Sequence, residues 1–214
     1  MRKLMLGTAV AVVAMVVVPG VAQAAVISSW SLATDASDWG GSNNGTATNV
    51  TFTGSAAVFD GTSSKISVPY NANLSPGSAD VTAKVEINTT FRPGTGDFDF
   101  DLLRSAKGNP QYKIELFPHS GKAQAQCIFH GSRANTTLYA GPSLNDGAWH
   151  SIVCTKTSNQ VTLTIDGAMV GTRTITIGSI THKSGTPFSM GYKPASGGAD
   201  FYHGSMRNGS VSIG

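Results

Sequence analysis

The chain has 214 residues, a formal net charge of +3 and 13% charged residues. This length accommodates one domain with a substantial hydrophobic core. There is no basic cluster that would neutralise a phosphate backbone, which argues against nucleic-acid binding. Glycine, serine and threonine are abundant, a composition typical of exposed β-sheet and polar turns.

Residues 1–24 have the pattern of a secretory signal peptide. Arg2 and Lys3 precede an apolar run from Leu4 to Val18, and Ala22-Gln23-Ala24 offers the small-x-small sequence that signal peptidase cleaves. The alternative is a membrane anchor, but the run is short for a span and no stop-transfer pattern follows it. We therefore expect cleavage after Ala24, a secreted domain over residues 25–214, and no membrane span in the mature protein.

The remainder of the chain alternates apolar and polar residues in short segments separated by Gly, Pro, Asn and Asp. This periodicity predicts strands at 58–59, 66–68, 81–87, 98–102, 112–116, 124–129, 151–156, 161–165, 173–177, 188–190 and 206–213. Many short strands and no helical periodicity indicate an all-β sandwich or barrel.

The chain has two cysteines, Cys127 and Cys154. An exported protein meets an oxidising compartment, so an even pair is interpreted first as a disulfide. Two cysteines without CxxC spacing do not supply a tetrahedral metal site.

Five short motifs resemble the laminin-G-like, concanavalin A-like domains. In chain order they are 58–61 (VFDG), 146–150 (DGAWH), 161–167 (VTLTIDG), 188–191 (FSMG) and 201–206 (FYHGSM). The resemblance implies a concanavalin A-like jelly-roll sandwich of two antiparallel sheets, in which Phe59 packs inward. Fold alone leaves function open, because this architecture is shared by lectins, adhesion modules, glycanases and lyases.

A more local likeness is to small secreted laminin-G-like proteins of actinobacteria. It is carried by residues 97–104 (DFDFDLLR), by Gln126-Cys127 and by residues 151–154 (SIVC). This resemblance implies that Cys127 and Cys154 lie on neighbouring strands and form the disulfide.

Asp97, Asp99 and Asp101 form an acidic array in which alternate residues share one strand face. Ca²⁺ takes several oxygen ligands, so the array is a candidate calcium site. Successive carboxylates on one strand are roughly 7 Å apart, within the range of an inverting glycosidase pair, although they project in one direction. The simpler interpretation is a solvated sheet face with Phe98, Phe100 and Leu102 in the core.

The catalytic signatures of this fold are missing from the sequence. The Glu-x-Asp-x-x-Glu strand of its retaining glucanases is absent, and the two glutamates, Glu86 and Glu115, lie in different segments. Residues 126–130 do not match the Gln-x-His strand of the alginate lyases, and no Gly-x-Ser-x-Gly elbow occurs. We interpret Trp149 as a core anchor and His130 and His150 as structural residues.

Sugar binding requires exposed aromatic rings for stacking and planar polar groups for hydroxyls. Trp39, Tyr139, Tyr192 and Tyr202 lie near Gly- or Ala-rich turns, where ligand loops often occur, and Arg104 and Asn109 could bind hydroxyls.

Three functions remain open at this point. The first is a secreted, non-catalytic module that binds an extracellular glycan or a cell-surface protein through loops at the sheet edge. The second is a glycan-active hydrolase or lyase that uses the aspartates or the two glutamates. The third is a structural or adhesion protein without a small ligand. The sequence leaves the oligomeric state undetermined.

Overall fold

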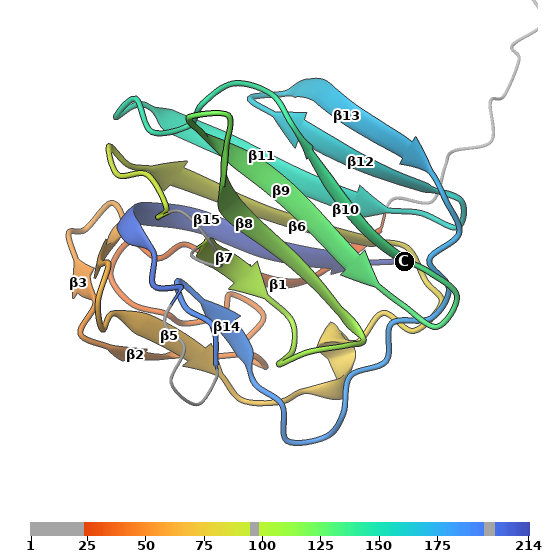
Figure 1. Ribbon diagram of the computed structural model, residues 1–214. Coiled ribbons are helices and arrows are strands. Elements are labelled where there is room, and N and C mark those ends of the chain that lie inside the picture. The colour runs from red at the N-terminus through yellow and green to blue at the C-terminus, as the bar shows by residue number, and fades with distance from the viewer. Residues whose placement is uncertain (1–23, 95–98, 195–199) are drawn as a thin grey trace, which may run out of the picture.

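The computed structural model describes residues 24–94, 99–194 and 200–214. They form two antiparallel β-sheets packed face to face (Figure 1), which confirms the predicted sandwich. The eight-stranded sheet has the order β13-β12-β11-β6-β15-β4-β3, and β1 pairs with β15. The seven-stranded sheet has the order β10-β9-β8-β7-β14-β5-β2. Among the described residues, no helix is long and apolar enough to cross a membrane.

The strands of the eight-stranded sheet are β1 (Ala25–Trp30), β3 (Thr51–Phe52), β4 (Ala57–Asp60), β6 (Val81–Asn88), β11 (Trp149–Lys156), β12 (Gln160–Ile165), β13 (Ala168–Thr174) and β15 (His203–Ile213). Those of the seven-stranded sheet are β2 (Thr46–Thr48), β5 (Lys65–Val68), β7 (Phe100–Arg104), β8 (Gln111–His119), β9 (Lys122–His130), β10 (Asn135–Ala140) and β14 (Phe188–Met190). A short 3-10 helix, η1 (Ala72–Leu74), precedes β6. The predicted strand at 173–177 is displaced, because β13 begins directly after the Asp166-Gly167 turn, and β1, β2, β3 and β10 were not predicted.

The sequence motifs correspond to turns and core positions. Asp166 and Gly167 both have positive φ, 52° and 81°, as a tight two-residue hairpin turn requires. Phe59 is fully buried, as expected, and Gly61 approaches His203 so closely that an added Cβ would lie 2.8 Å from that ring. Trp149 is not a core anchor: it lies half-buried on the outer face, where the Arg207 guanidinium packs 4.1 Å from its ring centroid.

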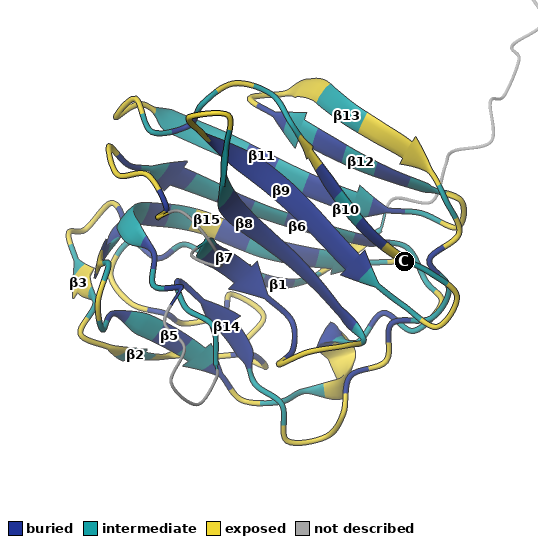
Figure 2. Cartoon of the chain, in the orientation of Figure 1, coloured by how far each residue is buried: buried dark blue, intermediate teal, exposed yellow. Residues whose placement is uncertain are grey.

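The two sheets differ in how their outer faces meet solvent. β6 alternates strictly between buried and half-buried residues, as a strand with one solvated face should. β8 and β9 are instead buried on both faces over most of their length (Figure 2). The inner face contributes apolar residues such as Tyr112 and Ile114, whereas the buried outer face is polar.

The disulfide between Cys127 and Cys154 is confirmed. Its location differs from the expectation: Cys127 is on β9 and Cys154 on β11, so the bond joins the two facing sheets and not neighbouring strands. Both cysteines are fully buried at inward-facing positions. The bond therefore crosses the core and fixes one sheet against the other.

Replacing both cysteines with alanine is expected to lower the free energy of unfolding by about 3–4 kcal/mol, because a cross-link closing a loop of this length restricts the unfolded chain. Urea denaturation of the wild-type protein and the double variant measures the difference. Equal denaturation midpoints would contradict a stabilising bond between the sheets.

Candidate functional site

The outer face of the seven-stranded sheet carries a continuous network of polar side chains, which we call the polar face. Its members are buried or half-buried: Asp101, Arg104, Gln111, Lys113, Glu115, Gln124, Gln126 and His130. Cross-strand register places Asp101 opposite Glu115 and Glu115 opposite Gln126. Polar groups from three adjacent strands therefore meet at the centre of the sheet.

A β-bulge in β7 positions the first part of this network. The register with β8 shifts between Asp101 and Leu103, so Asp101 and Arg104 lie on the same face although they are three residues apart. Arg104 Nε lies 3.4 Å from Asp101 Oδ2, and its Nη1 donates to Gln111 Oε1 at 3.0 Å. Strict alternation from the sequence would have placed Arg104 on the opposite face from Asp101.

Lys113 lies at the centre of the polar face, with its ammonium among three carboxylates. Its Nζ forms an ion pair with Glu115 and lies 3.7 Å from Asp101 Oδ1 and 4.0 Å from Asp99 Oδ2. Glu115 Oε1 also accepts a hydrogen bond from Gln126 Nε2. The ammonium acts as an internal counterion for the cluster.

This geometry bears on the predicted calcium site. Oxygens of Asp99, Asp101 and Glu115 lie within 4.8 Å of one another, a spacing compatible with a metal ion. The Lys113 ammonium already supplies a positive charge within 4.0 Å of all three carboxylates, and a calcium ion there would be repelled by it. The donor set therefore does not fit a metal while Lys113 is charged. Asp97, the third predicted ligand, lies outside the described residues.

Burial changes the protonation of the cluster. Desolvation, followed by the negative charge of Glu115, raises the pKa of Asp99 to about 8, although Lys113 opposes the shift. Desolvation raises the pKa of Asp101 to about 6, against the charges of Lys113 and Arg104. At neutral pH Asp99 keeps its proton and is uncharged. The two carboxylates of Asp101 and Glu115 then balance the two positive charges of Lys113 and Arg104. The prediction that the aspartates lie on a solvated sheet face is wrong for Asp101, because its side chain is 0% exposed.

The two glutamates do not form a pair. Glu115 is on β8 of the seven-stranded sheet, whereas Glu86 is on β6 of the other sheet. Glu86 accepts a hydrogen bond from Arg207 Nε at 2.8 Å. The sequence did not identify Glu115 and Lys113 as partners of the aspartates, although alternation in the β8–β9 hairpin already placed them on one face.

A group of aromatic rings, one of them exposed, lies at the β8–β9 turn end of the polar face. Phe117, His119 and Tyr139, the aromatic trio, pack with ring centroids 4.8–5.9 Å apart. Tyr139 is 44% exposed, and it is opposite Gln126 in the register of β10 with β9. The trio therefore borders the polar face directly.

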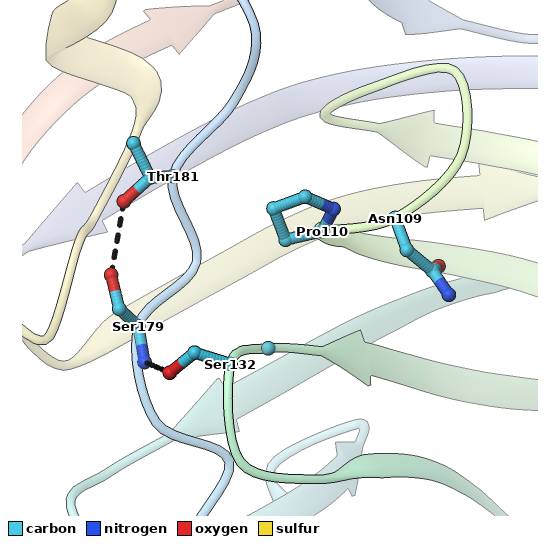
Figure 3. A pocket seen from close by; sticks show the side chains of 6 residues that line it. Asn109, Pro110, Ser132, Ser179 and Thr181 are labelled. Atoms are coloured by element: carbon cyan, nitrogen blue, oxygen red, sulfur yellow. Dashed lines mark hydrogen bonds between the residues drawn. The ribbon is translucent and has the colours of Figure 1, made fainter.

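A pocket of about 350 Å³ lies at the opposite end of the polar face. Figure 3 shows Asn109 and Pro110 on one side of it and Ser132, Ser179 and Thr181 on the other. Asn109 Oδ1 accepts from Gln111 Nε2 at 3.3 Å and contacts His130 Nδ1. The predicted hydroxyl ligand Asn109 thus connects the pocket to the polar face.

The remaining predicted ligand residues are dispersed. Trp39 is 88% exposed beside Val26 at the edge of the eight-stranded sheet. Tyr192 is half-buried against Phe201, with the Lys65 ammonium 5.8 Å from its ring centroid. Arg104 is only 5% exposed and is engaged within the polar face.

Tyr202 is not a ligand residue. Its side chain is 0% exposed, and its hydroxyl donates to the carbonyls of Asn88 and Ser205. It is a core residue that fixes two strands of the eight-stranded sheet.

His150 is structural, as predicted. Its Nδ1 lies 2.8 Å from Asp166 Oδ2 and its Nε2 lies 3.0 Å from Asp146 Oδ1. Both ring nitrogens donate only in the protonated imidazolium. Burial opposes that form, but the hydrogen bonds that the ring donates to both carboxylates raise the pKa of His150. The residue joins two turns and leaves no nitrogen free to act as a base.

Replacing Asp99 with asparagine is expected to stabilise the protein at alkaline pH. The pKa of Asp99 in the folded state, about 8, exceeds its ordinary value of 3.8. The folded state therefore keeps Asp99 protonated where the unfolded state does not, and the folded protein loses stability as the pH rises from the lower value to the higher. Asparagine resembles the protonated acid, and the variant should exceed the wild type by more than about 1 kcal/mol at pH 9 and match it near pH 3.5.

Denaturant titrations of both proteins across this pH range measure the difference. An asparagine variant that is less stable than the wild type at pH 9 would contradict the proposed protonation of Asp99.

Comparison with known proteins relates this architecture to domains of several origins. Residues 60–212 match the laminin G-type model of the concanavalin A-like lectin/glucanases superfamily. No curated protein sequence matches the chain. One similar solved structure is domain 4 of AbnA, an extracellular arabinanase from Geobacillus stearothermophilus, in complex with arabinotriose, with a TM-score of 0.66 and 17% identity over 90% of this chain and 94% of that domain.

In two further similar solved structures, this chain aligns with a smaller share of the other chain. The LG4-5 domains of the mouse laminin alpha1 chain align with a TM-score of 0.55 and 19% identity over 74% of this chain and 41% of that one. The binding domain of Paraclostridial Mosquitocidal Protein 1 aligns with a TM-score of 0.66 and 17% identity over 88% and 48%. The chain spans less than half the length of either. Because the family model covers most of the sequence and both sheets are present, the chain belongs to the concanavalin A-like lectin/glucanases superfamily.

Proposed function

We propose that the protein is a secreted, non-catalytic carbohydrate-binding module. Its ligand binds along the polar face, and one end of the ligand contacts the aromatic trio. One observation carries the proposal: an aromatic cluster with an exposed tyrosine borders a polar face on which, among the described residues, the buried Gln124 Oε1 has no hydrogen-bond partner. Glycans present both apolar C–H faces and hydroxyl groups, so a glycan matches the two halves of this surface.

The aromatic trio supplies the apolar half. Tyr139 has nearly half of its surface exposed and is supported by Phe117 and His119. Rings held by neighbouring rings lose little conformational entropy when a ligand stacks on them.

The polar half lies beside the trio on β8 and β9. Among the described residues, the buried Gln124 Oε1 accepts no hydrogen bond, whereas Glu115 Oε2 is paired with the Lys113 ammonium. A buried acceptor such as Gln124 Oε1 is costly to leave without a donor. Sugar hydroxyls would supply donors, which makes the polar face complementary to a hydroxyl-rich ligand.

The same cluster is poorly arranged for glycoside hydrolysis, the second function considered above. Its carboxylate oxygens lie within 4.8 Å of one another, a spacing too short for the roughly 6.5–9.5 Å of an inverting pair but close to the about 5–5.5 Å of a retaining pair. Asp101 and Glu115 are at most 1% exposed, and Lys113 lies between the acids. Binding is therefore favoured over catalysis.

Two further observations support an extracellular glycan as the ligand. The Cys127–Cys154 disulfide fits an oxidising compartment and agrees with the proposed signal peptide of residues 1–24. Domain 4 of the arabinanase, which has a similar fold, was solved with arabinotriose. A module of this kind could equally recognise a glycan on a cell-surface protein.

Replacing Tyr139 with alanine is expected to weaken glycan binding by about tenfold or more, which corresponds to about 1.4 kcal/mol, because the stacking surface is lost. A glycan array with and without Ca²⁺ identifies the ligand, and calorimetry with that oligosaccharide measures the affinity. Trp39→Ala is the matched control, since it removes a more exposed ring at the edge of the other sheet.

Equal affinity of the Tyr139 variant and the wild type would contradict the proposed location. Absence of binding to any glycan would favour a structural or adhesion protein.

A further inference from the structure

Two adjacent hollows lie at the β9–β10 turn. The pocket of about 350 Å³ in Figure 3 shares the lining residues Ser132 and Ser179 with a second hollow of about 360 Å³. We call the two hollows together the trough. Each half has the volume of a small-molecule site, and the first half is connected to the polar face through Asn109.

The walls of the trough are fixed by backbone contacts. Ser132 N donates to Ser179 O at 2.9 Å, Ser179 N donates to Ser132 Oγ at 2.9 Å, and Arg133 N donates to Ile177 O at 3.0 Å. Gly178 has φ of +79°, and a Cβ there would lie 2.6 Å from Ser132 Oγ. The turn and the segment after β13 therefore form one preorganised wall.

The second half of the trough has a distinctive charge. Arg133 and Lys156 line it together with five hydroxyl side chains, and no carboxylate lines it. Among the described residues, the exposed Arg133 guanidinium has no hydrogen-bond or ion-pair partner. No carboxylate of the lining therefore balances the positive charge of this hollow.

Lys156 strengthens this conclusion because it is almost completely buried. It is 1% exposed, and its ammonium donates to the carbonyls of Ser78 and Ala79 at 3.2 and 2.8 Å. An ammonium has three donors, so one remains. Burial lowers the pKa of Lys156, and the negative charge of Asp80 opposes that shift only in part. A buried cation of this kind is stabilised by an anion.

We infer that the trough is a binding site for an anionic substituent of a glycan, a carboxylate or a sulfate, with Arg133 and Lys156 as its counter-charges. The first half, with the Pro110 ring and Asn109, accommodates the neutral part of the same sugar chain. The inference rests on the proposed function, because it assumes that the anion is carried by a carbohydrate. It adds a preference for acidic glycans that the aromatic trio alone does not provide.

The inference is tested by calorimetry of the full mature chain with three probes of similar length: oligogalacturonate, sulfated dextran oligosaccharide and unsulfated dextran oligosaccharide. At least one anionic probe should bind tenfold or more tightly than the neutral probe. That preference should fall several-fold between 50 and 500 mM salt, since salt screens the charges. The carboxylate and sulfate arms show which anion is preferred.

Arg133→Gln should remove most of the preference for the anionic probe, and Arg133→Lys should retain part of it. Lys84→Gln is the matched control, because it removes one positive charge from β6 on the other sheet. Neutral and anionic probes bound equally by the wild type, or equal effects of Arg133→Gln and Lys84→Gln, would overturn the inference.

Failure of the inference is distinguishable from failure of the proposed function. If only the trough is wrong, Tyr139→Ala still weakens binding and Arg133→Gln behaves as Lys84→Gln does. If only the location at the aromatic trio is wrong, Tyr139→Ala has no effect while Arg133→Gln still removes the anionic preference. If none of the probes binds, the inference is overturned, and the glycan array decides the proposed function separately.

Discussion

The Lys113 ammonium among the carboxylates of Asp99, Asp101 and Glu115 is the interaction on which the outer face of the seven-stranded sheet depends. Three acids so close together and so deeply buried would repel one another without a cation. Lys113 and Arg104, with a proton retained on Asp99, make the cluster neutral near pH 7. The sheet can therefore present buried polar groups on its outer face while its inner face packs an apolar core.

That neutral network organises the rest of the surface. It extends through Gln126 towards the aromatic trio and through Gln111 and Asn109 towards the trough. The disulfide crosses the core beneath it and fixes β9 against β11. The result is a rigid surface with an apolar end, a polar middle and a positively charged end, and a surface with these three parts is suited to an extended glycan.

Much of the fold was predictable from the sequence because it depends on local chemistry. The strands on either side of the Asp166-Gly167 turn follow from alternation and from residues that tolerate positive φ, and the inward position of Phe59 follows from the family resemblance. The position of individual residues within the two sheets was harder to predict from the sequence. Nothing local places Cys127 and Cys154 in facing sheets, turns Trp149 outward towards Arg207, or buries Tyr202.

The candidate site was only partly predictable for the same reason. The acidic strand was recognised, but alternation alone misplaces Arg104, because the bulge after Asp101 changes which residues share a face. Glu115 and Lys113 join the cluster through cross-strand register, which depends on the whole sheet. Arg133 and Lys156 are far apart in the chain and meet only where the β9–β10 turn contacts the segment after β13.

The central claim is that a glycan binds on the outer face of the seven-stranded sheet. Hydrogen–deuterium exchange of the mature protein with and without a bound oligosaccharide tests it most directly. The account predicts slower exchange confined to β8, β9, β10, the β9–β10 turn and the segment after β13 that lines the trough. Protection confined to the Trp39 loop or to the outer face of the eight-stranded sheet would contradict it.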